Sequence, residues 1–477
     1  MNRLELLIVA WDGADYALVS RWLEAGLLPN LRQVLAGRSL VPLRSTLPPI
    51  TATAWASFHL GVNPGKHAIF DFATYRPGAP MRLVSSRDLP GPTFWELVSR
   101  QAPVGFLGFP LGYPARRLGG GFWVPGFLAP RGAASWPPDA MNVVHRAAPG
   151  YAFNPPAWRP GGAWAGELVG LVEAKTKAAL ALAEAYRPAL LGIHYQATDA
   201  VQHFLWGQEA VEQVFAAADR SLGRLVDRLS PKALLLVSDH GMGPLRWDLH
   251  LNSWLLDNGF LALRRRFSTK LRHLLYRRGL VLRRFQRVGE RMSALLAEVG
   301  IKPDVGAFWY RSLSGTGAFL SLEDVDWPRT VAFSPGGMGA VSLSGNGAAR
   351  RALEAALGEL RSPDGDPVVA ELYRADEVYW GDRVAASPHL LFLTRGMEVL
   401  PVSHRLFLNN DSFSPPSVPA HHRMRGILAA AGRPPLGSHR ETFIWDVAPA
   451  VLDQFGLAVP GHMEAAPRPG RRGTDVP

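Results

Sequence analysis

Three aspartates in the sequence each stand at, or just after, the end of a short apolar segment. The three pairs of segment and aspartate are 4–11 with Asp12, 189–195 with Asp199, and 233–238 with Asp239. If the segments are parallel strands, their carboxyl ends meet at one edge of the sheet and the three carboxylates converge there. Converging carboxylates repel and raise one another's pKa, which a divalent cation relieves. The pattern therefore predicts a metal site.

Two histidines extend this predicted ligand set. Asp199 and His203 are four residues apart, so on a helix they share one face and can reach the same ion. His240 follows Asp239 directly, and on a tight turn the two side chains can contact different neighbours. Carboxylate and imidazole donors without thiolate suit zinc or manganese better than an all-oxygen magnesium cage. We expect two divalent ions, with zinc as the metal and manganese as the alternative.

Thr51 is the candidate nucleophile. Two prolines precede it shortly and a helix-compatible run follows, which places its hydroxyl near a helix N-terminus. Backbone N–H groups and the helix dipole there stabilise an alkoxide and phosphoryl oxygens. Each residue also has an ordinary interpretation, with Asp12 as a turn former, Asp199 as a helix cap and Thr51 as an N-cap. Their joint placement at predicted strand ends favours a site.

The elements that must position these residues alternate between strand and helix. Apolar residues recur at helical spacing in 16–36, 163–185 and 210–229, between the three predicted strands. This alternation predicts a doubly wound α/β fold with a mostly parallel sheet flanked by helices. We interpret the glycine- and proline-rich stretch 104–160 as a loop excursion. Beyond residue 250 the pattern changes to a basic helical stretch and short strands at 330–333 and 339–343, typical of an inserted smaller α+β cap.

The predicted division of the chain follows from these changes. Residues 1–250 and 401–462 form a discontinuous catalytic core, 251–400 an inserted cap that selects the substrate, and 463–477 a disordered tail. The chain has 477 residues and no cysteine, which excludes disulfides, thiolate nucleophiles and thiolate metal sites. No long uncharged apolar segment or secretory leader is evident, so we expect a cytoplasmic protein without a transmembrane segment.

The charge balance favours anionic ligands. The formal net charge is +11, and basic residues concentrate between Arg264 and Arg291. A solvated face of two helices explains this basic segment most simply. Peripheral contact with an anionic surface is the alternative.

Several motifs resemble the type I phosphodiesterase and nucleotide pyrophosphatase group of the alkaline phosphatase superfamily, across most of the chain. The matching segments are Asp12-Gly13, Thr51 ten residues before Gly61, Asp199 with His203, Ser238 to Met242, His422 followed by Arg-Met-Arg-Gly-Ile-Leu, and the closing segment from Asp446. The resemblance implies an alkaline-phosphatase-like fold. It also implies one metal bound by Asp199, His203 and His422, a second by Asp12, Asp239 and His240, and Thr51 contacting both. His421 and His439 are alternatives for the last histidine ligand.

The same resemblance implies an activity. Thr51 would attack phosphorus and form a phosphothreonine during hydrolysis of a phosphodiester or phosphoanhydride, with a small anionic phosphoester as substrate and no specific nucleic-acid partner. The nucleotide-hydrolysing relatives carry an asparagine where this chain has Ala54, so the phosphoryl contact must come from elsewhere. Alternatives are a phosphomonoesterase or phosphomutase of the same superfamily, and a non-catalytic protein that binds anionic ligands through its basic insertion. A sulfatase is disfavoured because its nucleophile motif is missing.

Overall fold

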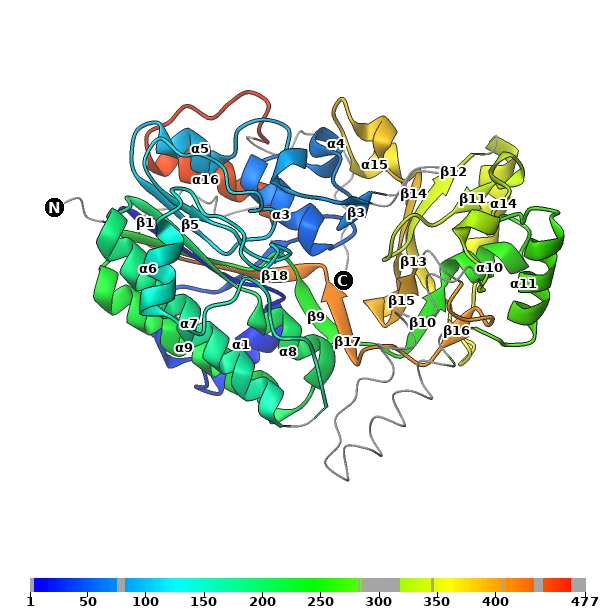
Figure 1. The fold of residues 1–477 in the computed structure, drawn as a ribbon, viewed down its shortest axis with the longest axis horizontal. Coiled ribbons are helices and arrows are strands. Elements are labelled where there is room, and N and C mark those ends of the chain that lie inside the picture. The colour runs from blue at the N-terminus through cyan, green and yellow to red at the C-terminus, as the bar shows by residue number, and fades with distance from the viewer. Residues whose placement is uncertain are drawn as a thin grey trace.

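An eight-stranded sheet forms the centre of the computed structural model (Figure 1). The structure describes residues 4–74, 82–160, 162–281, 284, 318–344, 347–404, 407–432 and 441–464. In sheet order the strands are β19 (Thr442–Phe443), β2 (Val41–Arg44), β18 (Arg425–Ala431), β8 (Ala233–Val237), β1 (Leu6–Trp11), β7 (Leu190–Tyr195), β5 (Val104–Leu107) and β6 (Gly121–Val124). Only β18 runs antiparallel to its neighbours in this sheet. The predicted α/β fold with a mostly parallel sheet is confirmed.

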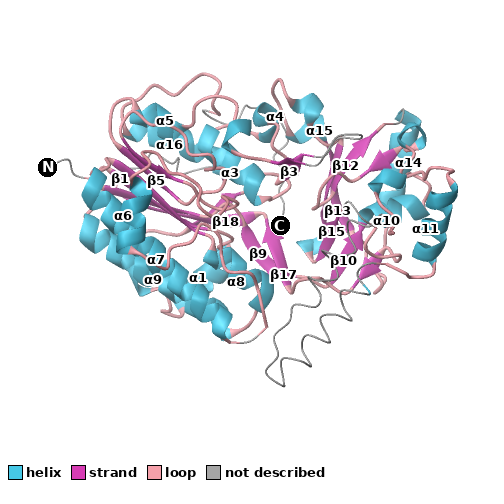
Figure 2. Ribbon diagram, in the orientation of Figure 1, coloured by secondary structure: helices cyan, strands magenta, loops and turns pink. Residues whose placement is uncertain are grey.

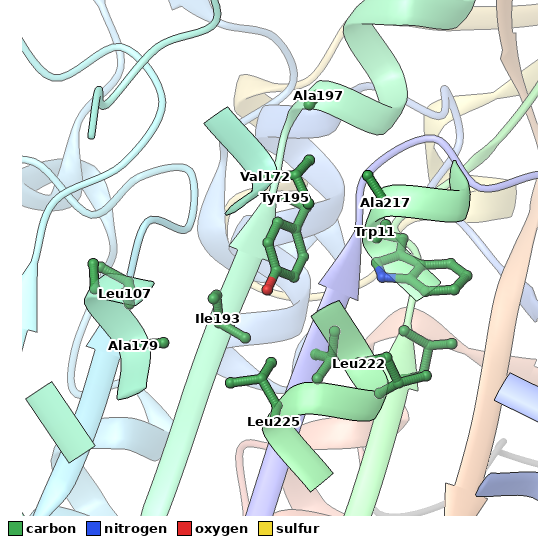
Figure 3. Close-up of a cluster of buried hydrophobic side chains, with 14 of the residues drawn as sticks. Trp11, Leu107, Val172, Ala179, Ile193, Tyr195, Ala197, Ala217, Leu222 and Leu225 are labelled. Carbon is green, nitrogen blue, oxygen red and sulfur yellow. The ribbon is translucent and has the colours of Figure 1, made fainter. Parts of the chain in front are cut away.

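Helices cover both faces of this sheet (Figure 2). One face carries α1 (Tyr16–Glu24), α2 (Pro29–Leu35), α6 (Ala140–Ala147), α7 (Ala163–Tyr186), α8 (Ala197–Leu205) and α9 (Glu209–Leu229). The other carries α3 (Thr51–Leu60), α5 (Phe94–Ser99) and α16 (Val447–Gln454). Residues of β1 point alternately to the two faces of the sheet. Trp11 packs in the apolar core under the helices of the first face (Figure 3), and Ile8 packs in the core under the helices of the other face. A strand buried on both faces must be apolar throughout, which explains why β1, β7 and β8 were recognisable.

A second set of sheets and helices forms the cap, on the right in Figure 1. Its sheets contain β10 (Trp247–His250), β15 (Val399–Val402) and β16 (Phe413–Ser414), and β11 (Ala332–Phe333), β12 (Ala340–Leu343), β14 (Leu390–Thr394) and β13 (Val369–Arg374). Its helices are α10 (Leu251–Asp257), α11 (Phe267–Arg277) and α14 (Gly347–Gly358). Leu249, Leu255 and Phe392 belong to a separate apolar core.

The chain enters and leaves the cap through two adjacent strands. There β9 (Gly241–Pro244) pairs antiparallel with β17 (Ala420–Arg423). Because β10 and β15 pair with each other in the cap, we propose that the insertion runs from β9 to β17, slightly wider than 251–400. The shorter elements are α4 (Pro64–His67), α15 (Ala375–Val378), β3 (Ala73–Thr74) and β4 (Arg82–Leu83). None of the described helices is long and apolar enough to cross a membrane.

Three expectations from the sequence need correction. The stretch 104–160 is not simply a loop excursion, because it supplies β5, β6 and α6. The expected helix 16–36 is two helices, separated where Gly26 adopts a φ of 77° and Pro29 begins α2. Met463 and Glu464, expected in a disordered tail, are 4% and 9% exposed. The remainder of that tail and His439 lie outside the described residues, as does the basic segment after residue 281 apart from residue 284.

Candidate metal centre

The three aspartates lie together at the carboxyl ends of adjacent strands. Asp12 follows β1, Asp239 follows β8 closely, and Asp199 lies in the first turn of α8, directly after β7. All three are buried, with exposed fractions of 0%, 0% and 6% for Asp12, Asp239 and Asp199. One oxygen of each carboxylate accepts no hydrogen bond from the described residues: Oδ1 of Asp12, Oδ1 of Asp199 and Oδ2 of Asp239. Buried oxygens without donors call for another charge partner.

Electrostatics point to a cation at this position. Burial raises the pKa of Asp12 well above its usual range, and the carboxylates of Asp239 and Asp199 raise it further. Burial and the nearby Asp199 carboxylate likewise raise the pKa of Asp239. Burial also favours a higher pKa for Asp199, but His203 and His422 outweigh it and the pKa falls. The protein alone therefore does not neutralise the Asp12 and Asp239 pair when both are ionised.

His240 completes a first group with these two aspartates. Its Nε2 atom lies 3.6 Å from Oδ1 of Asp12 and 3.3 Å from Oδ2 of Asp239. Both of these oxygens are the ones that lack a hydrogen-bond donor. The candidate ligand atoms of the three residues lie within 4.8 Å of one another. The group has the nitrogen and oxygen donors of a zinc or manganese site.

A second group forms around Asp199. Its Oδ1 atom is 3.3 Å from Nε2 of His203 and 3.6 Å from Nε2 of His422. The two histidine Nε2 atoms are themselves 3.1 Å apart. The ring of His422 stacks on that of His240 with centroids 3.6 Å apart, so the two groups are contiguous. The expectation that Asp199 and His203 share a helix face is met on α8.

The histidine rings are oriented in the same way. In each, Nδ1 lies at hydrogen-bond distance from a backbone carbonyl, which can only accept, so Nδ1 carries a hydrogen and Nε2 is the nitrogen that faces the carboxylates. The pairs are His203 with Ala420 at 3.0 Å, His240 with Gly241 at 3.0 Å, and His422 with Pro49 at 2.7 Å. Burial lowers the pKa of His240 to about 3, which keeps that ring neutral. Burial alone would lower the pKa of His203, but the Asp199 carboxylate outweighs it and the pKa rises in the metal-free chain. Imidazoles fixed through Nδ1, with Nε2 toward carboxylates, are arranged as metal ligands are.

Thr51 faces the first of these groups. It is the first residue of α3 and is 2% exposed, and its Oγ1 atom lies 3.1 Å from Nε2 of His240. Ile50 at the N-cap supplies no side-chain acceptor, so the N–H groups of the first helical turn have no capping side chain. The expected position of Thr51 at a helix N-terminus is confirmed.

Gly13 allows the close approach of two of the aspartates. Its φ is 68°, in the left-handed region, and an added Cβ would lie 3.0 Å from Oδ1 of Asp199. A side chain at this position would therefore push Asp199 away from Asp12.

His421 lies at the edge of the cluster. Its ring centroid is 4.9 Å from that of His203, and its Nδ1 atom has no hydrogen-bond partner among the described residues. His422, by contrast, is tied to Pro49 through Nδ1 and turns Nε2 toward Asp199. The geometry favours His422 over His421 as the member of the Asp199 group.

One residue that shapes the site, His194, was not selected from the sequence. The Nε2 atom of His194 lies 2.7 Å from Oδ2 of Asp12. Trp55 Nε1 donates to the same oxygen at 3.3 Å, which leaves Oδ1 directed toward His240. A histidine within an otherwise apolar, fully buried strand was the signal that could have identified it.

Replacement of His194 tests whether it positions Asp12. His194→Ala is expected to lower divalent-metal affinity roughly 10- to 100-fold, because Asp12 loses a buried donor that holds its orientation. His194→Gln is expected to restore part of the affinity, since its amide can still donate. Titration of metal into the apoprotein measures both. The control is His67→Ala, which removes a buried histidine bonded to Ser57. An equal loss of affinity in the control would contradict a specific role for His194.

Comparison with known proteins supports the fold described above. A sequence model of the type I phosphodiesterase / nucleotide pyrophosphatase family matches residues 6–311. No curated protein matches the chain. Solved structures with a similar fold include phosphonoacetate hydrolase from Sinorhizobium meliloti 1021 in complex with phosphonoformate, with 16% identity, a TM-score of 0.58 and coverage of 95% of this chain and 96% of that one.

Murine ectonucleotide pyrophosphatase / phosphodiesterase 5, as an inactive variant in complex with AMP, is also similar, at 12% identity and a TM-score of 0.50 over 96% of this chain and 97% of that one. Identities this low show a shared fold and no more. The family match covers more than half of the chain and includes the segments that carry six of the seven candidate site residues, all but His422. The chain therefore belongs to the type I phosphodiesterase / nucleotide pyrophosphatase family.

Proposed function

We propose that the protein is a two-metal hydrolase of phosphodiesters or phosphoanhydrides with Thr51 as its nucleophile. The observation that carries this proposal is the position of the Thr51 hydroxyl, 3.1 Å from His240 Nε2 at the start of α3. It is a buried hydroxyl that faces a cluster of carboxylates and imidazoles. A hydroxyl held beside such a cluster is placed to act as a nucleophile.

The proposed ligand sets follow the two groups. Asp199, His203 and His422 would hold one divalent ion, and Asp12, Asp239 and His240 the other. Zinc is the expected metal and manganese the alternative, because the donors are imidazole nitrogen and carboxylate oxygen. When bound, such ions lower the pKa of a hydroxyl and stabilise negative charge on the attacking and leaving oxygens.

The chain's own groups then account for the covalent steps. Oγ1 of Thr51 gives up its proton to solvent and forms a bond to phosphorus, while the bond from phosphorus to the leaving oxygen breaks and that oxygen takes a proton from solvent. Water then attacks the phosphothreonine, the bond between Oγ1 and phosphorus breaks, and the hydroxyl takes back a proton. Atoms balance over the two steps, and the net change is hydrolysis. Attack and departure lie in line, as in other phosphoryl transfers.

Phosphoryl oxygens need donors other than a side chain at position 54. Ala54 is buried and its N–H group bonds to the carbonyl of Ile50, within the helix. The N–H groups of the first turn of α3 are the nearest alternative, because a helix N-terminus offers free donors and a positive dipole end to an anion. We propose that these backbone groups replace the asparagine side chain of the nucleotide-hydrolysing relatives.

The cap contributes apolar side chains beside the cluster. Met338, Met397 and Leu400 line a small pocket that also includes His421 and His422. This contact supports the proposal that the cap selects the substrate's leaving group. An apolar wall accommodates a small phosphoester with an uncharged leaving group better than one with a charged leaving group.

The activity is tested with a panel of chromogenic substrates. With zinc or manganese supplied, bis-p-nitrophenyl phosphate is expected to turn over faster than p-nitrophenyl phosphate, and p-nitrophenyl sulfate only marginally. Phosphonoacetate is tested beside the chromogenic substrates, through release of inorganic phosphate, because a solved hydrolase of this fold is named for it. A preference for the monoester would favour the phosphomonoesterase or phosphomutase alternative. Absence of turnover under any metal loading would favour an anion-binding protein.

A further inference from the structure

Helix α11 of the cap presents apolar side chains to solvent. Phe267, Leu271 and Leu274 are 83%, 47% and 47% exposed, and Leu280, just beyond the helix, is 48% exposed. The three helical residues are spaced by four and three positions, so they form one continuous stripe along α11. Exposed leucines scattered singly are ordinary, but a stripe on one helix face marks a binding surface.

The opposite face of α11 is anchored to the rest of the cap. Thr269 and Tyr276 are 2% and 1% exposed. The Thr269 hydroxyl and the Arg272 guanidinium both donate to Asp324, and the Tyr276 hydroxyl donates to the carbonyl of Asn409. The helix is therefore held by its polar and aromatic inner side, and its apolar stripe is not used for packing within the described part of the cap.

Cations border the apolar stripe. Arg265, Arg266, Lys270 and Arg278 are all exposed. At 100° per residue, Lys270 and Arg278 fall on the same side of the helix as Phe267. Among the described residues, no ion pair involves these four side chains, whereas the neighbouring Arg277 pairs with Asp257 at 2.7 Å. The surface thus combines exposed hydrocarbon with positive charge that pairs with none of the described carboxylates.

The position of α11 leaves this surface accessible. Figure 1 shows α11 at the outer end of the cap, on the side away from the eight-stranded sheet that carries the metal cluster. A flat partner could approach α11 without covering the cluster. Changes on this face should therefore affect attachment and leave the chemistry unaffected.

We propose that the exposed face of α11 binds the surface of an anionic phospholipid bilayer, with Phe267, Leu271 and Leu274 inserted at the headgroup boundary and the flanking arginines and lysine on the phosphates. The helix of 11 residues is about 16 Å long, far shorter than the roughly 30 Å hydrocarbon core, and it lies in the plane of the interface. Apolar insertion and cation attraction together give reversible attachment. This inference does not depend on the proposed catalytic function.

Vesicle sedimentation tests the proposal with the full chain. Binding is expected to vesicles of equal parts phosphatidylcholine and phosphatidylglycerol and to be much weaker to pure phosphatidylcholine. The triple variant Phe267→Ser, Leu271→Ser, Leu274→Ser is expected to lower the partition constant at least roughly tenfold. The double variant Lys270→Gln, Arg278→Gln is expected to lower the partition constant about 25-fold, at roughly fivefold per cation. Added salt should also weaken binding of the wild type to the anionic vesicles.

The matched control is Leu27→Ser, which removes another exposed leucine, 43% exposed and outside the cap. Its partition constant should equal that of the wild type. The melting temperatures of the α11 variants should match that of the wild type, which shows that they fold. Equal binding to neutral and anionic vesicles, or unchanged binding in the triple variant, overturns the proposal. So does a wild-type dimer in sedimentation velocity that the triple variant dissociates, because a second copy of the chain would then cover the stripe.

Discussion

Thr51→Ala is expected to reduce phosphodiester turnover by roughly 10³-fold or more, the loss usual when a covalent nucleophile is removed. Thr51→Ser should retain a measurable share of activity, because a serine hydroxyl occupies nearly the same position. The fold should tolerate both changes. Thr51 loses one hydrogen bond, to His240 at 3.1 Å, worth about 1 kcal/mol. Thermal unfolding and initial rates measured on the same preparations separate these two effects.

The chain offers a closely matched control in Thr53. It lies two residues along the same helix and is also buried, but its Oγ1 atom has no hydrogen-bond partner in the described structure. Thr53→Ala should therefore leave turnover close to the wild-type value. Rapid quenching with substrate, followed by mass spectrometry of the Thr51 peptide, should show an added phosphoryl group in the wild type. Similar activity losses in the two alanine variants, with no phosphorylated Thr51, would exclude the nucleophile role.

The central strands were predictable because burial on both faces removes ambiguity. The apolar runs 4–11, 189–195 and 233–238 became β1, β7 and β8 with shifts of at most two residues. Their polar ends had to meet at one sheet edge, which is why the three aspartates could be grouped from the sequence. Thr51 was placed by the prolines before α3, since proline ends an extended segment and starts a helix.

The strands β5 and β6 were missed because their glycines were interpreted as loop residues. The structure shows that these glycines serve close packing: an added Cβ on Gly105 would lie 2.6 Å from Phe122, and one on Gly121 would lie 2.1 Å from the carbonyl oxygen of Val104. Glycine required by contact between strands and glycine required by a turn have the same letter in the sequence. Only the tertiary partners distinguish them.

The role of His194 could not be predicted for a related reason. It lies opposite Ala10 in the pairing of β7 with β1, close to the end of β1 where Asp12 follows. Its contact with Asp12 depends on the register of two strands that are far apart in the sequence. A single sequence gives strand positions but does not give their register.

Metal removal and replacement of Asp12 are expected to have opposite effects on stability. Chelation should abolish turnover and lower the melting temperature of the wild type, because ions that bind only the folded state stabilise it by about 2.7 kcal/mol at 100 times their dissociation constant. In the metal-free state, Asp12→Asn should unfold at a higher temperature than the wild type near neutral pH. The variant removes one of the buried carboxylates that repel each other once the ions are gone.

The pH dependence follows from the direction of the pKa shifts. Burial and neighbouring carboxylates raise the pKa of Asp12 and Asp239 in the folded, metal-free chain above their unfolded values. The folded state then binds more protons than the unfolded state, so the stability from these two groups is complete below the unfolded pKa and is lost as pH rises through the folded pKa. In Asp12→Asn this loss should be smaller, which melting curves of the apoprotein across pH can measure.

Asp219→Asn separates this effect from the general cost of changing a buried aspartate. Asp219 is 1% exposed, and its carboxylate accepts hydrogen bonds from the backbone and side chain of Asn30 and from the backbone of Leu31. Its oxygens are satisfied by the protein, so the asparagine variant should be less stable with and without metal and should keep its activity. In Asp12 the Oδ1 atom accepts no hydrogen bond from the described residues. Asp12→Asn should therefore lose roughly 10²-fold or more in turnover and gain apoprotein stability. If Asp12→Asn instead destabilised the apoprotein as Asp219→Asn does, the carboxylate cluster would be a structural network and not a pair of cation sites.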